Sequence, residues 1–164
     1  MTILEKQIDL LVRYTTTDDE ELKKQLREEL TATLQETREE DPAVYSNKLS
    51  DAIDELLDEL GAPHNLIGRK HLHKAIRMAV TDEECLTQIT SVLYPAIAKE
   101  ANTTPSRVER AIRHAIETAW DRGDYRTLKN YFGNTIDRDK AKPTNHHFIA
   151  GCANIVRRQM RGAV

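Results

Sequence analysis

Apolar residues recur along nearly the whole chain at intervals of three and four, which is the spacing of one face of an α-helix. Alternation of apolar and polar residues with a period of two, which marks a half-buried strand, is nearly absent. Breaks are few as well, because the 164 residues include only 6 Gly and 5 Pro. The pattern therefore predicts an all-α protein.

Three helices are predicted in residues 1–62. Their apolar stripes are Ile3, Ile8, Leu11 and Val12 in the first helix, Leu22, Leu26, Leu30 and Leu34 in the second, and Leu49, Ile53, Leu56, Leu57 and Leu60 in the third. Thr17 and Glu20 have the spacing of a capping box before the second helix, and Gly61 is a typical stop after the third. Because a unit of this size buries little apolar surface, we expect it to pack on itself, on a second copy or on the rest of the chain.

A domain boundary is predicted at residues 61–63, and further helical patterns follow it. They cover about 68–80, about 84–93 after a capping box of Thr81 and Glu84, about 125–132 with Asp124 as N-cap, and about 145–161 with Thr144 as N-cap. The stretch between the second and third of these is the most informative part of the chain.

Residues 93–123 have the pattern of a short helix, a tight turn and a longer helix. Thr104 is the expected N-cap of the longer helix, and Pro105 is its first residue, where a missing N–H does little harm. One face of this helix is apolar and consists of Val108, Ile112, Ala115, Ile116 and Ala119. The opposite face carries Ser106, Arg107, Arg110, Arg113 and Glu117.

The exposed residues nearest the start of the longer helix are Ser106, Arg107, Glu109 and Arg110. In a helix-turn-helix this part of the second helix enters the major groove of DNA. Arginine donates two hydrogen bonds to O6 and N7 of guanine, and glutamate accepts one from the amino group of cytosine. The pattern favours a reader of double-stranded DNA, although the solvated face of an ordinary amphipathic helix has the same spacing.

Charge is distributed unevenly, although the whole chain carries only −3. Residues 1–62 hold 7 Lys and Arg against 17 Asp and Glu, a net charge of −10, whereas residues 63–164 hold 17 against 10, a net charge of +7. A basic part joined to an acidic one favours a nucleic-acid surface on the basic part.

Several classes of protein are disfavoured. Cys85 and Cys152 are too few for a disulfide framework, and neither a leader nor an apolar run of membrane-spanning length is present. The histidines do not have zinc-site spacing, and no catalytic constellation is evident. We therefore expect a protein of a reducing cytoplasm, with no enzymatic activity, no metal, no cofactor and no membrane contact.

From about Leu66 to Gln159 the chain resembles the C-terminal DNA-binding effector domain of the stage-zero sporulation master regulator family. The matching stretches are Leu93-Tyr94-Pro95, Ile97-Ala98-Lys99, residues 106–117, Ala119-Trp120, Arg122-Gly123, Phe132-Gly133, residues 141–145 and Phe148-Ile149-Ala150. The resemblance implies a six-helix helix-turn-helix domain over residues 63–164, here preceded by the acidic three-helix unit of residues 1–62. It does not extend to the receiver domain that the family's regulators carry at the front.

The resemblance also implies a function and its residues. Family members bind a short box with a TGTCGAA-like core in the major groove, and their effector domains pair on DNA. By matching motif, Arg107, Glu109 and Arg110 would read bases, with Ser106 and Arg113 beside them. Further phosphate contacts would come from Lys142, Thr144 and Asn145, although Thr144 equally fits a helix cap. Trp120 and Phe132 fit a core role better than a stacking one.

Three questions stay open at this stage. The chain is expected to be a sequence-specific transcription regulator, but a non-enzymatic protein that pairs with, or competes against, the full-length sporulation regulator fits as well. The leucine stripes suit a homodimer interface or an intramolecular core. The acidic helices also suit a third role, in which they fold back over the basic face and mask it.

Overall fold

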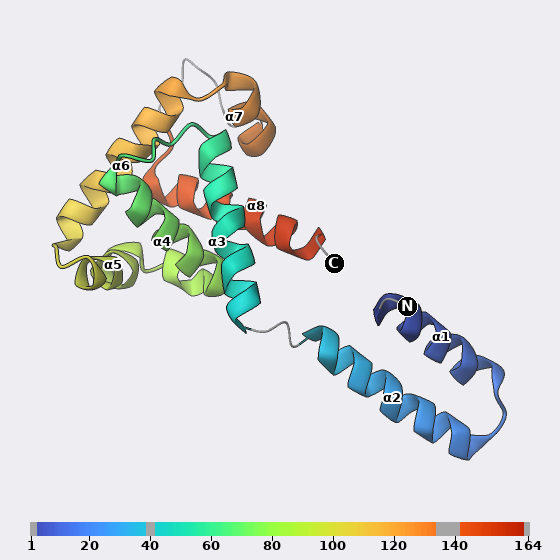
Figure 1. Cartoon of the computed structure of the whole chain (residues 1–164). Coiled ribbons are helices and arrows are strands. Elements are labelled where there is room, and N and C mark those ends of the chain that lie inside the picture. Colours follow the sequence, from blue (N-terminus) through green and yellow to red (C-terminus); the bar gives the residue numbers. More distant parts are fainter. Residues whose placement is uncertain (1–2, 39–41, 134–141, 163–164) are drawn as a thin grey trace. The chain divides into compact units, whose positions relative to one another are not determined.

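The computed structural model describes residues 3–38, 42–133 and 142–162, and within these ranges the chain forms helices and no strands (Figure 1). The predicted all-α class is confirmed. The α-helices are α1 (Ile3–Thr16), α2 (Glu20–Arg38), α3 (Pro42–Glu59), α4 (Ile67–Thr81), α5 (Tyr94–Glu100), α6 (Pro105–Arg122), α7 (Tyr125–Phe132) and α8 (Asn145–Gly162). A turn of 3-10 helix, η1 (Glu83–Leu86), and a π-helical turn, η2 (Ile89–Leu93), connect α4 to α5.

The chain divides into two compact units, Met1–Ser46 and Asn47–Val164. This division lies near the start of α3, after Ser46, whereas the sequence pattern placed the boundary after this helix, at residues 61–63. The physical reason is the apolar stripe of α3, whose leucines and isoleucine lie in one core with residues of α4, α6 and α8. The stripe consists of Leu49, Ile53, Leu56, Leu57 and Leu60, each 2% exposed or less. The acidic first unit thus consists mainly of α1 and α2, and α3 from Asn47 onward belongs to the second unit.

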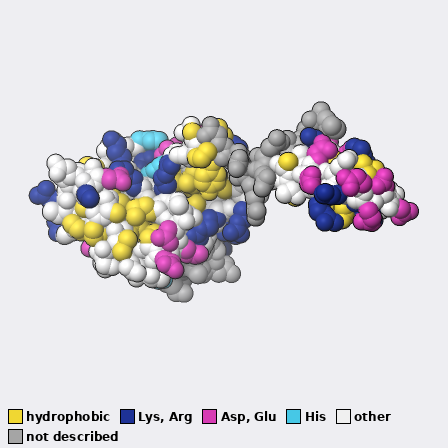
Figure 2. All heavy atoms as spheres, turned by 90° about the horizontal axis from the view of Figure 1, so that it is seen from below, with side chains coloured by type: hydrophobic (Ala, Val, Ile, Leu, Met, Phe, Trp, Pro, Cys, Tyr) yellow, Lys and Arg dark blue, Asp and Glu magenta, His cyan; other side chains and the backbone are white. Residues whose placement is uncertain are grey.

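Moving the boundary reduces the charge contrast between the parts. Residues 1–46 hold 6 Lys and Arg against 12 Asp and Glu, a net charge of −6, and residues 47–164 hold 18 against 15, a net charge of +3. Figure 2 shows acidic side chains spread over the smaller unit and several groups of Lys and Arg on the larger one. The basic excess of the second unit is modest, so its position on the surface matters more than its size.

In the second unit α4 is the central helix and packs against both α6 and α8, while α5 packs against α6 (Figure 1). Phe148 of α8 is fully buried and stacks on Phe132, with ring centroids 5.3 Å apart. Trp120 meets the edge of the same Phe132 ring at 6.0 Å. Both Trp120 and Phe132 therefore pack against the core, as predicted.

Arg69 and Tyr131 make polar contacts that attach the C-terminal half of α3 to the rest of this unit. Arg69 of α4 is buried, donates to the backbone oxygen of Ala62 at 2.6 Å, and pairs with Asp58 at 2.8 Å and with Asp54 at 3.3 Å. At the same end of α3, the Tyr131 hydroxyl of α7 donates to the carboxylate of Glu59, which raises the pKa of Tyr131 to about 12. These contacts join the acidic end of α3 to α4 and α7.

Several predicted helix ends are confirmed. Gly61 follows α3 in the left-handed region, with φ of 78°, and the N–H of Ala62 donates to Leu57 at 2.9 Å, which completes a C-terminal cap. Asp124 caps α7, because its carboxylate accepts from the N–H of Thr127 at 3.0 Å.

Both predicted capping boxes are wrong. The cap of α2 is Asp19, which accepts from the N–H groups of Glu21 and Leu22 at 3.0 and 3.2 Å, and Thr17 lies two residues before it. After α4, Asp82 accepts from the N–H of Glu84 and opens the short η1, so the continuous helix expected over about 84–93 is replaced by η1 and η2. In both places the aspartate next to the helix start satisfies the free N–H groups that were assigned to a threonine.

Candidate nucleic-acid interface

The start of α6 is fixed by the turn before it. Asn102 adopts a left-handed conformation with φ of 50°, which asparagine tolerates better than most residues, and the N–H of Thr103 donates to Ala98 at 2.9 Å. Thr104 then caps α6 by accepting from the N–H of Arg107 at 3.4 Å, and Pro105 is the first helical residue. The predicted cap and helix start are confirmed, so α5, the turn and α6 form a helix-turn-helix.

The two faces of α6 are those predicted. Its inner face is fully packed, with each side chain 1% exposed or less: Val108, Ile112, Ala115, Ile116 and Ala119. On the outer face Ser106, Arg107, Arg110 and Arg113 are exposed, whereas Glu109 is half-buried. The core therefore holds the helix, and its first two turns present arginines to the solvent.

A shallow depression lies on this outer face. Its lining consists of Arg107, Arg110, Ala111, Arg113, His114 and Glu117. Three guanidinium groups surround a small side chain there, which is an arrangement suited to a polyanion. His114, which the sequence marks only as a flanking position, is exposed and lies in the same depression.

Glu109 and Arg113 form an ion pair on this face. The Nη2 atom of Arg113 lies 2.8 Å from Oε1 of Glu109, four residues before it on the helix. Side-chain exposure is 60% for Arg113 and 40% for Glu109, so the pair is accessible to an approaching ligand. The pair holds both side chains at the same end of α6 as Arg110.

The structure separates the remaining candidates from this cluster. Lys142 pairs with Asp121 at 2.7 Å, near the C-terminal end of α6 rather than its start. Thr144 caps α8 by accepting from the N–H of His147 at 3.2 Å, so its role as a helix cap is confirmed. Neither side chain lies in the depression formed by the arginines.

Asn145 has its partners inside the protein. It is 7% exposed, and its amide donates to the hydroxyl of Tyr94 at 3.0 Å and to the backbone oxygen of Glu109 at 3.2 Å. Tyr94 is buried as well, which raises the pKa of its hydroxyl. The amide thus joins the start of α8 to α5 and to the first turns of α6. The Tyr94 contact was not predicted, because nothing in the sequence pairs residues 51 positions apart.

Asn145→Ala is expected to lower the free energy of unfolding by about 1 to 3 kcal/mol, because a buried hydroxyl and a backbone carbonyl would lose their donor. Urea unfolding measures this loss. Asn130→Ala is the matched control, since Asn130 is exposed on α7. If Asn145→Ala weakens DNA binding while its unfolding midpoint stays at the parent value, the amide contacts DNA rather than α6.

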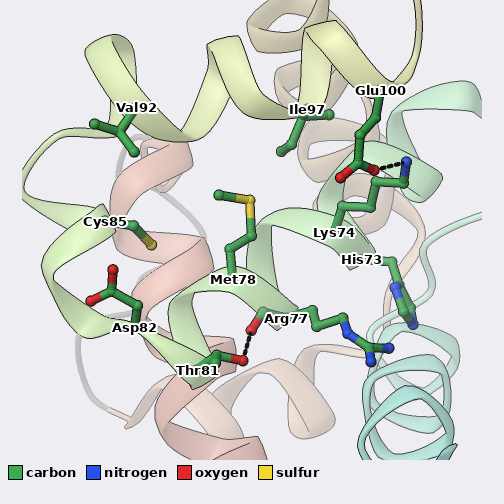
Figure 3. A pocket seen from close by; sticks show the side chains of 10 residues that line it. All are labelled: His73, Lys74, Arg77, Met78, Thr81, Asp82, Cys85, Val92, Ile97 and Glu100. Carbon is green, nitrogen blue, oxygen red and sulfur yellow. Dashed lines mark hydrogen bonds and ion pairs between the residues drawn. The ribbon is translucent and has the colours of Figure 1, made fainter. Parts of the chain in front are cut away.

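A separate hollow lies between α4, η1, η2 and α5 (Figure 3). Met78, Cys85, Val92 and Ile97 supply apolar walls, and Lys74, Arg77, Asp82 and Glu100 place charges around them. Lys74 contacts Glu100 at 2.6 Å and holds the pKa of that carboxyl below its usual range. Among the described residues, no group of three or more His, Cys, Asp and Glu side chains is placed to hold a metal ion.

A short helix, a fixed turn and a longer helix with exposed arginines in its first turns define a helix-turn-helix protein of the DNA-binding class. Residues 53–156 match the model of the family described as "Sporulation initiation factor Spo0A C terminal". The chain therefore belongs to this family, and the resemblance seen in the sequence is confirmed.

The family consists of DNA-binding domains of transcription regulators and not of enzymes. The expected DNA-binding class and the expectation of a non-enzyme are thereby confirmed. The matched segment begins within α3, in agreement with the placement of that helix in the second unit. No helix of the described ranges has the length and apolar character needed to span a membrane.

Proposed function

We propose that the protein is a transcription regulator that reads a sporulation-type box in double-stranded DNA, with α6 in the major groove. The observation that carries the proposal is the exposed cluster of Arg107, Arg110 and Arg113 at the start of a helix whose other face is buried. Membership of a family of DNA-binding regulators supports it. We place the protein at the nucleoid of a bacterial cell.

Each candidate residue has a proposed role. Arg107 and Arg110 donate to O6 and N7 of guanines, and Glu109 accepts from the amino group of a cytosine. Ser106 and Arg113 contact the backbone or adjacent base edges. Lys142, at the far end of α6, is a proposed phosphate contact, whereas for Thr144 and Asn145 we propose that they position α6 and α8.

Replacing Arg110 by alanine is expected to weaken binding to a box duplex by about 1 to 3 kcal/mol and to relax the preference for the box over a scrambled duplex. The reason is that a bidentate contact carries base identity, whereas a phosphate contact does not. Fluorescence anisotropy with both duplexes measures the two effects.

The matched control is Arg161→Ala, which also removes one positive charge, from an exposed position in the last turn of α8. It should weaken binding to both duplexes by the same small factor. Binding of the parent should fall by roughly 0.9 log unit per log unit of salt for each phosphate contacted. An Arg110→Ala variant that still prefers the box as strongly as the parent does would overturn the assigned base contacts.

An alternative is that the chain acts as an interaction protein, paired with or competing against the full-length sporulation regulator. The feature that favours it is the acidic helical pair of residues 1–46, with its net charge of −6. If the purified chain retards box DNA only when the full-length regulator is present, this alternative replaces the first proposal. Pairing of two copies of this chain is part of the first proposal.

A further inference from the structure

Helix α1 packs against α2 through a seam that consists of Gln7, Leu10 and Tyr14. Leu10 on this seam is 2% exposed, the Gln7 amide donates to the backbone oxygen of Thr33 at 3.2 Å, and the Tyr14 hydroxyl accepts from Arg27 at 2.9 Å. Positions 7, 10 and 14 follow the spacing of three and four residues that is typical of paired helices.

The second seam of α1 is exposed. It consists of Leu4, Ile8, Leu11 and Val12, which are 66%, 53%, 48% and 54% exposed. At 100° per residue this seam lies roughly 110° around the helix from the seam that contacts α2. Such an angle is found in a helix that has two neighbours, as in a four-helix bundle.

On α2, Leu34 extends the exposed surface. It is 48% exposed and follows Thr33, whose backbone oxygen contacts Gln7 of α1. The predicted stripe of α2 is divided, because Leu26 is buried against α1 while Leu34 is exposed. The leucine stripe of α2 thus serves mainly the contact within the pair, and among the described side chains of the two helices most of the large exposed apolar ones lie on α1.

The pair of helices buries too little to be stable alone. Among the described side chains of residues 4–34, those of Leu10, Leu26 and Thr33 are buried. Burying a leucine contributes about 1.5 to 3 kcal/mol, whereas ordering each residue costs roughly 1 to 2 kcal/mol. The pair therefore requires further apolar contact to stay folded.

We propose that the second seam of α1, together with Leu34, is the interface through which two copies of this chain form a four-helix bundle. Five side chains that are about half exposed or more present on the order of 500 Å² per copy, so that two copies would bury about 1,000 Å², where specific interfaces begin. In a two-fold contact each copy contributes the same apolar surface, so the second seam of one copy covers the second seam of the other. This interface belongs to the homodimer included in the proposed function, but it forms without DNA.

Salt distinguishes this contact from DNA binding. Each copy brings a net charge of −6 in residues 1–46, so the two pairs of helices repel one another. Salt screens this repulsion, and dimerisation should tighten as salt rises. DNA binding should weaken over the same range.

Sedimentation velocity of the full chain without DNA tests the interface. The parent is expected to sediment at about twice its chain mass of 18.8 kDa, and the double variant Ile8→Glu/Leu11→Glu at 18.8 kDa, with dimerisation weakened at least about 100-fold. Ile8→Leu should remain dimeric. Val92→Glu is the matched control, since Val92 is 41% exposed but lies in the second unit, and it should also remain dimeric.

Two outcomes would overturn the proposed interface. One is a parent chain that stays at 18.8 kDa at all concentrations from 1 to 100 µM, which includes the case in which another protein or the second unit covers the seam. The other is a double variant that dimerises as the parent does while keeping the parent's circular dichroism. Box binding is measured on the same samples: a dimeric chain that fails to bind the box refutes the proposed function and leaves the interface standing.

Discussion

Gly68→Ala is expected to lower the free energy of unfolding by about 3 kcal/mol or more and to abolish specific binding to box DNA. A Cβ at Gly68 would overlap the backbone carbonyl of Ala111 in α6 and lie 3.0 Å from the Cβ of Ala115. Alanine favours a helix over glycine by about 1 kcal/mol, so propensity alone predicts the opposite sign. The loss would therefore report the close approach of α4 to α6.

Urea unfolding and anisotropy with the box duplex measure the two effects of Gly68→Ala. DNA binding should suffer because Ala111 lies among the arginines of the outer face, and a shift of α6 moves all of them. Gly162→Ala is the matched control, since no atom lies within 4 Å of a Cβ built there. A Gly68→Ala protein as stable as the parent would show that α4 and α6 separate at little cost.

Arg69→Ala is expected to lower the free energy of unfolding by about 2 to 4 kcal/mol. The side chain is 4% exposed, and its loss leaves the backbone oxygen of Ala62 without its donor at 2.6 Å. Asp54 and Asp58, its carboxylate partners, are 53% and 51% exposed, so water replaces part of what they lose. The cost should accordingly lie below that of removing one member of a fully buried pair.

Urea unfolding also measures this change, with Lys70→Ala as control because Lys70 is the next residue on α4 and is exposed. Arg69→Lys should give an intermediate loss, since one ammonium group cannot reach all the partners of a guanidinium fork. If Arg69→Ala unfolds at the parent's urea concentration, the Arg69 contacts contribute little to the attachment of α3.

The features of α6 were predictable because they are local. Spacing alone identifies the buried face with Val108 and Ile112, and a threonine followed by Pro105 identifies the start. The same helical spacing predicts that Arg107 and Arg110 are exposed. The sequence does not indicate which helix packs against each face. The role of Gly68 depends on such a contact, because it lies against Ala111 of α6.

The capping errors have a physical origin in residues that compete for the same role. Thr17 and Asp19 both precede α2, and Thr81 and Asp82 both precede η1. A short polar side chain caps whichever N–H groups the packed helix leaves free, and packing decides where the helix starts. The aspartate next to the start is therefore used in both places.

The boundary expected at residues 61–63 differs from the division after Ser46 because a turn that ends a helix and a linker contain the same residue types. Gly61 and Pro63 do end a helix, but Leu56, Leu57 and Leu60 before them are buried in the core that also contains α4 and α8. A stripe of leucines indicates that one face of a helix is buried, but it does not indicate which other helices pack against that face. A fragment beginning at Leu66 would lack this part of the core, so a fragment meant to fold should begin near Asn47.

The ion pair between Glu109 and Arg113 has a consequence for how well the proposed reader rejects unrelated DNA. A duplex that offers only phosphates must compete with Glu109 for the Arg113 guanidinium, which the carboxylate holds at 2.8 Å, and brings negative charge close to that carboxylate. A duplex with a cytosine in register supplies an amino group that Glu109 accepts. In the proposed complex, Glu109 therefore increases the preference for the box over unrelated DNA and lowers the affinity for DNA in general.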